Sequence, residues 1–405
     1  MGIGYIGLPM ALLLAQKVKV IGFDIDKSKL DCIHHNKLPF SEKGLNSLFA
    51  LKRVKNNFSV QDHVPKTDVY IISVPTPANR GKADLTYVMR ALDIIRPVFQ
   101  KNGLIIVEST IGPCDCRDLI IPYVESWHTP YHFVHCPERA IPGNTLYEMI
   151  HNDRIIGADT NKSAILASNV YKLFVKGDIF FTDPNTAAMA KVMENTYRAV
   201  NIALANELSG IADAVGINVW EAIYLANKHP RVHLHSPGLG TGGHCIPIDP
   251  WFLVRGDNQK GIIEKALMVN EQMPKKIALK VKEIISKKKN QGRPTIGILG
   301  YAYKKNVDDW RETPSERLLQ ALEKDYHLLL HDPYVKKAGE RDFTNLHDLL
   351  LLSSIVIIAT PHDEYKKISF SQYANITDVI DCHNCADVSE FLRTKISYHL
   401  IGAMT

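Results

Sequence analysis

A glycine-rich segment of the chain carries a cysteine in a place where a thiol could react. The stretch GLGTGGHCIPIDPWF, residues 238–252, holds four glycines before Cys245 and places Asp249 four residues after it. Glycines let the backbone approach a ligand closely and can leave N–H groups free to meet an anion, and such surroundings favour the nucleophilic thiolate. A buried structural cysteine normally lies within a regular apolar pattern, which this segment lacks. The spacing therefore favours a reactive Cys245.

A second glycine pattern opens the chain. Residues 2–7 read GIGYIG, which fits the Gly-x-Gly-x-x-Gly fingerprint, and Asp24 ends the next apolar run. In dinucleotide-binding folds these glycines bring a pyrophosphate to a helix N-terminus, and an acid at about this distance meets the adenosine ribose of NAD. The fingerprint normally follows a strand, whereas this chain begins one residue before the first glycine. We therefore expect the first strand of the sheet to be missing and the true start to lie upstream.

Two pairs of polar residues are further candidates for site groups. Lys191 and Asn195 are four residues apart in a helical pattern and so share one helix face, and Glu138 precedes Arg139 in the proline-bounded loop HCPERAIPGN. Each pair can also be interpreted as ordinary surface residues with no role in a site. Lysine and asparagine can lie along an apolar helix face with their heads in water, and Glu138 with Arg139 can form an exposed ion pair.

Short apolar runs that end in small polar residues must position these groups. Residues 17–26, 67–77 and 102–110 follow this pattern, and the ends of the last two runs contain Thr76 and Thr110. Such units are typical of a parallel α/β sheet, which binds ligands beyond the carboxyl ends of its strands. A strand-end threonine is, however, often no more than a turn former.

The pattern changes along the rest of the chain. Residues 185–216 have apolar residues at helical spacing and predict one long helix, capped by Asn185 or Thr186, and a second α/β unit opens near residue 292. We predict an α/β fold in which two Rossmann-like doubly wound domains are joined by a long central helix and a helical middle domain. The predicted domains cover residues 1–184, 185–290 and 291–405.

Composition excludes several classes of protein. The chain has 405 residues, a formal net charge of +5 and seven cysteines, and no apolar run is long enough for a membrane span. The small net charge does not favour a nucleic-acid-binding protein. The odd number of cysteines does not favour a secreted protein held together by disulfides. CDC and CHNC segments do not complete a four-ligand pattern, so no metal is expected. We expect a cytoplasmic protein with reduced thiols.

Several long motifs, spread over nearly the whole chain, together resemble one enzyme family. They are GIGYIG, CPERAIPG, KVMENTYRAVNIALANE, PGLGTGGHCIPIDPWF and KKNVDDWRETP. They are similar to the NAD-dependent nucleotide-sugar 6-dehydrogenases, the group that contains the UDP-glucose and GDP-mannose dehydrogenases. Within this family, CPERAIPG and the segment around Cys245 are most similar to the branch that oxidises UDP-N-acetyl-D-mannosamine.

The resemblance implies a reaction and a role for each candidate residue. The family performs two successive NAD-dependent oxidations at C6 of the sugar, from alcohol to aldehyde to acid. Cys245 would add to the aldehyde to give a thiohemiacetal, which is oxidised to a thioester and then hydrolysed. Lys191 and Asn195 would stabilise oxyanions, Asp249 and a water would handle protons, and Glu138 would orient water or act as the general base.

The resemblance also implies two binding sites. The residues expected to contact NAD are Gly2, Gly4, Tyr5, Ile6, Gly7, Asp24, Lys29, Pro75, Thr76, Thr110 and Arg311. The residues expected to contact the UDP-sugar are Glu138, Arg139, Lys191, Asn195, Arg231, Gly238, Gly242 and Lys304. By the same resemblance the three domains would bind NAD, carry the dimer contact and catalytic helix, and bind the UDP-sugar, and the protein would be a homodimer or a dimer-based higher oligomer.

Other interpretations remain open on the sequence. UDP-N-acetylglucosamine or UDP-glucose are alternative substrates. A two-electron β-hydroxyacid dehydrogenase shares the Rossmann domain and long helix but needs neither Cys245 nor a second α/β domain. A truncated, inactive nucleotide-binding relative is the non-enzyme alternative. The segment IGPCDC after Thr110 and the residue His383 depart from the usual family pattern.

Overall fold

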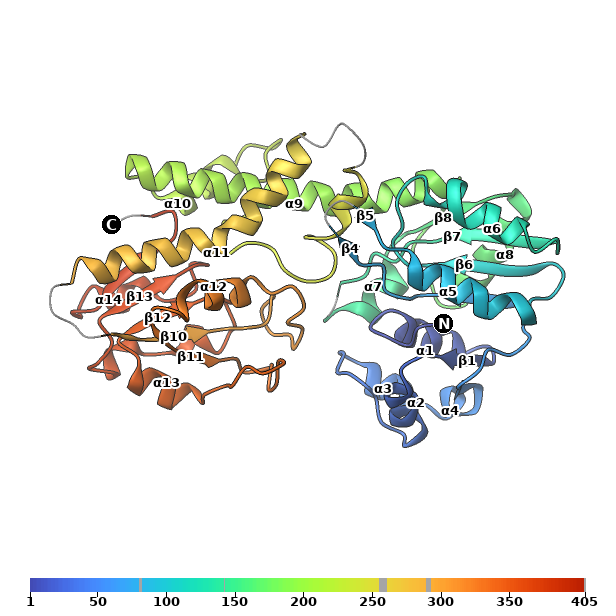
Figure 1. Cartoon of the computed structure of the whole chain (residues 1–405), viewed down its shortest axis with the longest axis horizontal. Coiled ribbons are helices and arrows are strands. Elements are labelled where there is room, and N and C mark those ends of the chain that lie inside the picture. The colour runs from blue at the N-terminus through green and yellow to red at the C-terminus, as the bar shows by residue number, and fades with distance from the viewer. Residues whose placement is uncertain (80–81, 142, 255–260, 289–292, 404–405) are drawn as a thin grey trace. The chain divides into compact units, whose positions relative to one another are not determined.

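The computed structural model describes residues 1–79, 82–141, 143–254, 261–288 and 293–403 of the chain. The chain divides into two compact units (Figure 1). Unit 1 comprises Met1–Glu194 and Trp251–Arg255, and unit 2 comprises Asn195–Pro250 and Gly256–Thr405. The domain boundary that the sequence predicts between residues 290 and 291 lies outside the described residues.

The main sheet of unit 1 has five strands in the order β3-β6-β7-β8-β9. Their bounds are β3 Val69–Ile72, β6 Gly103–Val107, β7 Tyr131–His135, β8 Arg154–Ala158 and β9 Ile179–Thr182. All neighbours are parallel except β7 and β8, which are antiparallel. The parallel strands and the helices between them confirm the predicted α/β class. The reversal at β8 was not predicted.

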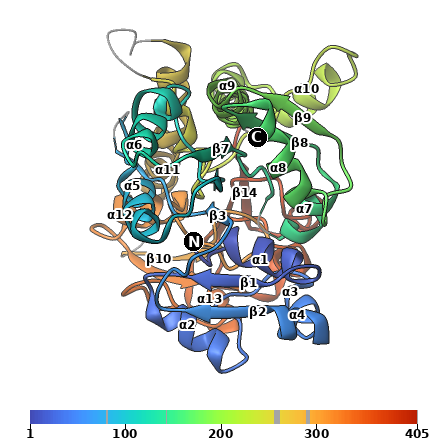
Figure 2. The same cartoon turned by 90° about the vertical axis from the view of Figure 1, so that its right-hand side faces the viewer.

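Helices cover both faces of this sheet. The helices are α5 Thr86–Ile95, α6 Ile121–Glu125, α7 Thr145–His151 and α8 Asn161–Tyr171. Figure 2 shows α5 and α6 on one side of the sheet and α7 and α8 on the other. Strand β6 is buried along its whole length, because Ile105 and Val107 pack with one helical layer while Leu104 and Ile106 pack with the other.

A second, two-stranded sheet in unit 1 pairs β1, Val20–Phe23, with β2, Phe58–Gln61, in parallel. Met1 and Gly2 lie between β1 and β3. The Gly2 N–H donates to the Phe23 carbonyl at 2.8 Å, and the Ser73 N–H donates to the Met1 carbonyl at 2.8 Å. The sheet is thus interrupted at the place where the sequence predicts its first strand. Met1 and Gly2 occupy the position of the carboxyl end of that strand.

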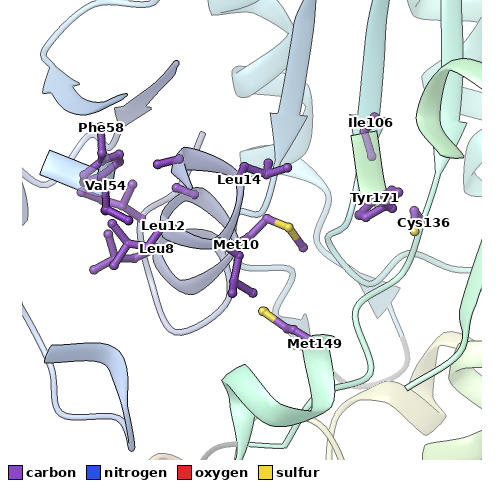
Figure 3. Packing of buried hydrophobic residues seen from close by; sticks show 14 of the residues in the cluster. Leu8, Met10, Leu12, Leu14, Val54, Phe58, Ile106, Cys136, Met149 and Tyr171 are labelled. Atoms are coloured by element: carbon purple, nitrogen blue, oxygen red, sulfur yellow. The ribbon is translucent and has the colours of Figure 1, made fainter. Parts of the chain in front are cut away.

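The glycine fingerprint leads directly into α1, Gly7–Ala15, which is buried on all sides from Leu8 onward. Figure 3 shows Leu8 and Leu12 towards Val54 and Phe58, and Met10 towards Met149. An apolar helix with no polar face is stable only in such a buried position. The remaining elements of this part are α2 Lys27–His34, α3 Leu45–Phe49, α4 Lys52–Asn57 and the short pair β4 Ala78–Asn79 and β5 Lys82–Ala83.

The predicted long helix is confirmed as α9, Pro184–Val215, which runs unbroken through Gly210. Its cap differs from the expected Asn185 or Thr186. Asp183 accepts hydrogen bonds from the N–H groups of both residues, at 2.9 and 3.1 Å. Pro184 explains the difference, because proline is favoured at the first helical position and places the cap one residue before it. Helix α10, Val219–Ala226, follows and is capped by Asn218.

Unit 2 contains a second doubly wound sheet in the order β11-β10-β12-β13-β14, with every pair parallel. The strands are β10 Thr295–Leu299, β11 His327–His331, β12 Ile355–Ile358, β13 Asp378–Asp381 and β14 Ser397–Leu400. The helices are α11 Ile262–Ser286, α12 Pro314–Leu322, α13 Leu346–Leu352 and α14 Val388–Phe391. This sheet confirms the second α/β unit that the sequence predicts.

All seven cysteines lie within the described residues, and none of them forms a disulfide there. Within the described ranges, no helix has the length and apolar character needed to cross a membrane. The same residues contain no group of three His, Cys, Asp or Glu side chains that could hold a metal ion.

Candidate active site

The three fingerprint glycines of unit 1 have different surroundings. A Cβ on Gly7 would lie 1.8 Å from the Gly2 carbonyl oxygen, and one on Gly2, which has φ of 83°, would lie 2.5 Å from the Ser73 carbonyl oxygen. A Cβ on Gly4 would meet nothing within 4 Å. Gly2 and Gly7 therefore close the turn onto the strand ends, while Gly4 leaves open space beside the start of α1.

The N-terminus of α1 suits an anion. Ile6 occupies the cap position and makes no side-chain hydrogen bond to the helix N–H groups. Uncapped N–H groups and the positive end of the helix dipole attract phosphate. Tyr5, the neighbouring candidate, packs against Phe40 with ring centroids 4.3 Å apart and ring planes tilted by 32°.

Asp24 lies at the end of β1 and is almost fully buried. One carboxylate oxygen accepts hydrogen bonds from the Ile3 N–H and the Lys29 ammonium, both at 3.0 Å, and the other accepts from the Asp26 N–H at 2.9 Å. The structure thus brings Asp24 and Lys29 together beside the glycine turn. A carboxylate fixed in this way fits the ribose of a dinucleotide.

The other predicted cofactor loops follow β3 and β6. The Ser109 hydroxyl joins the two loops, because it donates to the Val74 carbonyl at 2.7 Å and accepts from the Val74 N–H at 2.9 Å. Thr76 is buried, Pro75 is exposed and Thr110 is half-buried. Ser109 was not among the predicted residues, although its position at a strand end is the same signal that selected Thr110.

Glu138 is held by two backbone donors and one buried ion pair in unit 1. Its Oε1 accepts from the N–H groups of Arg139 and Ala140 at 2.7 and 2.8 Å, and its Oε2 lies 2.8 Å from Nη2 of the buried Arg154. The Arg139 side chain is used differently, since its guanidinium contacts Glu194 at 2.7 Å and the Asp153 carbonyl. Glu138 and Arg139 therefore do not form the surface ion pair that was the alternative interpretation.

Asn195 and Asp249 form a buried pair in unit 2. The Asn195 amide donates to Oδ2 of Asp249 at 2.6 Å. The Asp249 N–H in turn donates to the Cys245 carbonyl at 2.8 Å, so a tight turn carries Asp249 back beside the cysteine. Cys245 itself is exposed, and Lys191 is buried one turn before Asn195 on α9.

The glycine loop before Cys245 fits closely against its neighbours. A Cβ on Gly242 would lie 2.6 Å from Cβ of Tyr303, and one on Gly243, with φ of 80°, would lie 2.7 Å from the Tyr303 ring. A Cβ on Gly238 would lie 2.5 Å from the His383 ring. The segment needs glycine because larger residues would push Cys245 away from these side chains.

Two residues beside Cys245 were not predicted from the sequence. Burial raises the pKa of Tyr303, and the charges of Asp309 and Cys245 raise it further. Burial and the nearby Arg311 lower the pKa of His244, so its imidazole is neutral at pH 7. The position of His244 directly before Cys245 was a usable signal, whereas Tyr303 is brought to the loop by long-range packing alone.

Three further candidates lie elsewhere in unit 2. The Arg311 guanidinium pairs with both carboxylate oxygens of Asp309, at 2.9 and 2.7 Å, while its carbonyl accepts from the Gly243 N–H at 2.9 Å. Lys304 is half-buried next to Tyr303 in the chain. Arg231 is exposed, and its described contacts are with His229.

Comparison with protein families gives matches over most of the chain. Residues 1–175 match the NAD binding domain of the UDP-glucose/GDP-mannose dehydrogenase family, residues 185–273 its central domain and residues 297–388 its UDP binding domain. The NAD-binding match agrees with the open space at Gly4, the uncapped α1 and Asp24.

Individual relatives are similar over nearly their full length. A UDP-N-acetyl-D-mannosamine dehydrogenase of Methanocaldococcus jannaschii is 42% identical over 98% of this chain and 92% of its own. An NDP-N-acetyl-D-galactosaminuronic acid dehydrogenase of Ralstonia nicotianae is 35% identical, with 91% of each chain covered. The solved structure of a UDP-D-ManNAc dehydrogenase from Pyrococcus horikoshii has a TM-score of 0.92 at 35% identity, covering 99% of this chain and 98% of that one. The chain belongs to the UDP-glucose/GDP-mannose dehydrogenase family.

Proposed function

We propose that the protein oxidises UDP-N-acetyl-D-mannosamine at C6 to UDP-N-acetyl-D-mannosaminuronate, in a four-electron reaction with Cys245 as the covalent nucleophile. The observation that carries the proposal is the exposed Cys245 at the end of a tightly packed glycine loop, with the buried Asn195–Asp249 pair joined to it by the turn. The relatives named as UDP-N-acetyl-D-mannosamine dehydrogenases support the choice of sugar.

The cofactor half of the reaction rests on unit 1. Bound NAD accepts the hydride in each of the two oxidations. The Gly7 N–H and the positive end of the α1 dipole would hold its pyrophosphate beside Gly4, and Asp24 with Lys29 would hold its ribose. The other contacts proposed within unit 1 are Gly2, Tyr5, Ile6, Gly7, Pro75, Thr76 and Thr110, and the one proposed from unit 2 is Arg311.

The first oxidation needs a group that stabilises negative charge on the C6 oxygen as the hydroxyl proton leaves. Lys191 and Asn195 are buried on one face of α9, where a cation and an amide donor act more strongly than in water. We assign this role to them. Asp249 accepts from the Asn195 amide, which fixes the orientation of that amide, and it is the proposed proton acceptor through a water.

The second oxidation needs an sp³ carbon that still carries a hydrogen. The Cys245 sulfur supplies it by bonding to the aldehyde carbon, with the proton passing to the former carbonyl oxygen, and the resulting thiohemiacetal loses hydride and proton to become a thioester. Water then bonds to the thioester carbon, the C–S bond breaks, and the thiol is restored as the acid forms. Glu138 is assigned to the water of this last step, while Arg139, Arg231, Gly238, Gly242 and Lys304 are proposed sugar-nucleotide contacts.

A stoichiometry measurement tests the proposal. The purified full-length chain is mixed with NAD and each of UDP-N-acetyl-D-mannosamine, UDP-N-acetylglucosamine, UDP-glucose and GDP-mannose. We expect two NADH per molecule of the first sugar and acid as the product. Cys245→Ser should lower acid formation on the order of 10³-fold or more. One NADH per sugar, acid formed at the normal rate by Cys245→Ser, or preference for another sugar would each contradict the proposal.

We also propose that the protein is a homodimer formed through α9. Exposed apolar side chains recur along this helix at spacings of four and seven residues, which makes a stripe that a second copy of the same helix can cover. They are Met189, Met193, Tyr197, Leu204, Ile211 and Val215. The stripe is self-complementary if two helices meet about a two-fold axis, and the occupant is therefore a second copy of this chain.

Sedimentation equilibrium tests the dimer. The wild-type chain should sediment at twice its monomer mass, and Leu204→Glu with Ile211→Glu should give a folded monomer. Leu352→Glu, which places the same charge on a still more exposed leucine of α13, should leave the dimer intact. A monomeric wild type would contradict the proposal.

The reduced thiols and the nucleotide cofactor support a cytoplasmic location. We assign NAD binding to residues 1–184, dimerisation and catalysis to residues 185–290, and UDP-sugar binding to residues 291–405.

A further inference from the structure

A buried network of amide groups in unit 2 ends on the glycine segment that carries Cys245. The Gly238 N–H donates to Oδ1 of Asn206 at 2.9 Å. The Asn206 amide donates to Oδ1 of Asn270 at 2.9 Å, and the Asn270 amide donates to the Ala199 carbonyl at 2.9 Å. Both asparagine side chains are almost fully buried, with exposed fractions of 1% each. This amide network therefore connects α9, α11 and the glycine segment.

The two backbone ends of the amide network fix the orientation of both asparagines. A backbone N–H can only donate and a backbone carbonyl can only accept. Gly238 therefore requires the oxygen of Asn206, and Ala199 requires the NH2 group of Asn270. The remaining NH2 group of Asn206 then faces the remaining oxygen of Asn270. Because a buried polar group without a partner costs free energy, the network resists any change in its geometry.

Helix α9 holds the Cys245 segment on both sides of the cysteine. Asn195 and Asn206 are eleven residues apart on α9, close to three helical turns, so both lie on one face and about 16 Å apart along the axis. Asn195 donates to Asp249, which follows the cysteine, and Asn206 accepts from Gly238, which precedes it. The segment that carries the thiol is thus anchored to the same helix before and after Cys245.

Two glycines near the first anchor point are in close contact with other parts of unit 2. A Cβ on Gly240, which has φ of 121°, would lie 2.6 Å from the Asn270 carbonyl oxygen. Asn270 thus contacts the segment with its backbone as well as through the amide network. A Cβ on Gly238 would lie 2.5 Å from the His383 ring, whose Nε2 donates to the Ala359 carbonyl at 2.9 Å. His383, which departs from the usual family pattern, therefore also fixes the position of Gly238.

Helix packing alone does not require the amide network. Replacing both partners of a buried hydrogen bond with apolar groups of the same shape can be nearly neutral for stability. An apolar pair in place of Asn206 and Asn270 could therefore hold α9 against α11. Such a pair would provide no acceptor for the N–H of Gly238, which is a buried residue. The asparagines are thus explained by the position of the glycine segment rather than by the packing of the two helices.

We propose that Asn206 and Asn270 are positioning residues that hold the start of the Cys245 segment, so that the thiol stays in place for its reaction with the aldehyde. This inference rests on the proposed function and deepens it. The first oxidation does not use the thiol. In the next step the sulfur bonds to the aldehyde carbon and the proton passes to the oxygen, which requires the sulfur to lie close to that carbon. Loss of the amide network should therefore slow the second oxidation more than the first.

Hydrogen exchange measured by mass spectrometry on the full-length chain tests the anchor without relying on activity. In wild type the peptide that contains Gly238 should be protected from exchange. In Asn206→Ala the Gly238 N–H loses its acceptor, so exchange in residues 238–244 should become about 10-fold faster. Asn270→Ala keeps that acceptor but no longer orients it, so exchange there should rise by less. Exchange in β10 and β12 should stay within about 3-fold of wild type.

Asn201→Ala is the matched control for the exchange measurement. Asn201 also lies on α9, and its amide donates to the Tyr197 carbonyl at 2.8 Å on the surface of the helix. This variant loses an asparagine from the same helix but keeps the amide network, so exchange in residues 238–244 should not change.

Three results of the exchange measurement would overturn the proposal. The first is equal acceleration in Asn201→Ala and Asn206→Ala. The second is acceleration of β10 and β12 in Asn206→Ala to the same degree as the glycine segment, which would mean a general loss of stability. The third is an unprotected Gly238 peptide in wild type, which decides the question even if neither Asn206→Ala nor Asn270→Ala folds.

Single-turnover kinetics, with the protein in excess over the sugar nucleotide, separates the two oxidations. In Asn206→Ala the first NADH should form within about 3-fold of the wild-type rate, and the second about 10- to 100-fold more slowly. Hydroxylamine should trap the aldehyde that accumulates. Equal slowing of both oxidations is what a merely structural role would give, and it would overturn the proposal. Failure of every sugar nucleotide to yield NADH would sink the proposed function and leave the exchange result standing.

Discussion

The Asn195 amide donates a 2.6 Å hydrogen bond to the Asp249 carboxylate, and both side chains are buried in unit 2. Asp249→Ala removes the acceptor and leaves a buried amide group without it, which should lower the free energy of unfolding by about 1–3 kcal/mol. Turnover should fall on the order of 10²-fold because the amide is no longer fixed towards an oxyanion. Urea unfolding and NADH formation measure the two effects.

A double variant in which Asn195 and Asp249 are exchanged separates the structural role of this pair from its catalytic role. Asn195→Asp combined with Asp249→Asn restores one donor and one carboxylate, with their places reversed. Stability should return most of the way to wild type, while turnover should stay low because the carboxylate now stands where an oxyanion donor is needed. Full recovery of turnover in the double variant would show that the orientation of the pair does not matter.

We expect replacement by alanine to have different consequences at Gly4 and at Gly7. A Cβ on Gly4 meets nothing within 4 Å, so Gly4→Ala should fold with a stability within about 0.5 kcal/mol of wild type. Its methyl group would fill the space left for the pyrophosphate, so KM for NAD should rise. A Cβ on Gly7 would lie 1.8 Å from the Gly2 carbonyl, so Gly7→Ala should destabilise by at least about 1–3 kcal/mol.

Thermal unfolding and NAD titration distinguish these two variants. Alanine is normally the better residue inside a helix, which makes loss of stability in Gly7→Ala a specific result of the close contact. A Gly4→Ala protein with unchanged KM for NAD would mean that the pyrophosphate does not lie beside this glycine.

We expect a substitution of Asp24 to change the preference for NAD over NADP. Asp24→Asn removes the charge and keeps one oxygen, which can accept from either the Ile3 or the Asp26 N–H but not from both. Loss of a charged hydrogen bond to the ribose should raise KM for NAD about 10-fold. The repulsion that excludes NADP should fall at the same time, so the ratio of kcat/KM for NAD over NADP should drop.

Asp26→Asn is the matched control for this prediction. Asp26 is exposed and caps α2 through the Ser28 N–H, which asparagine can also do. KM for NAD should not change in this variant. Equal effects of the two substitutions would argue against a ribose contact by Asp24.

The parts of the fold that could be predicted are those coded by local pattern. The strand-end positions of Asp24, Thr76 and Thr110, the long helix α9 and the second α/β unit all follow from periodicity and turn residues within short windows. Asp183 as the cap of α9 was also local information, and it was missed because Asn185 and Thr186 are good caps in general.

The residues that could not be predicted are placed by contacts between distant segments. Arg154 reaches Glu138 because β8 runs antiparallel to β7, and nothing near residue 154 in the sequence specifies that direction. Tyr303 reaches the glycine loop of Gly242 and Gly243 across some sixty residues of chain. Such contacts depend on strand order and packing, which one sequence constrains weakly.

Asp332 and Asp363 in unit 2 give a prediction about acid stability. Burial alone would raise the pKa of Asp332, but hydrogen bonds from His362 and from the Ala302 and Val335 N–H groups lower it to about 2. Hydrogen bonds from Lys366 and Asn306 lower the pKa of Asp363 to about 2 as well. The two aspartates differ in burial, since Asp332 is 2% exposed and Asp363 lies on the surface.

A carboxyl with a folded-state pKa below its unfolded value near 4 stabilises the fold above pH 4, and this contribution is lost as the pH falls through 2. Asp332→Asn should therefore destabilise unit 2 by about 2–3 kcal/mol at pH 7, with a difference from wild type that shrinks steadily below pH 4. Asp363→Asn should change stability little at any pH, because water and salt screen an exposed pair. Calorimetric Tm values of the full-length variants from pH 7 to pH 2 measure this contrast, and equal losses in the two variants would mean that burial does not set the strength of these interactions.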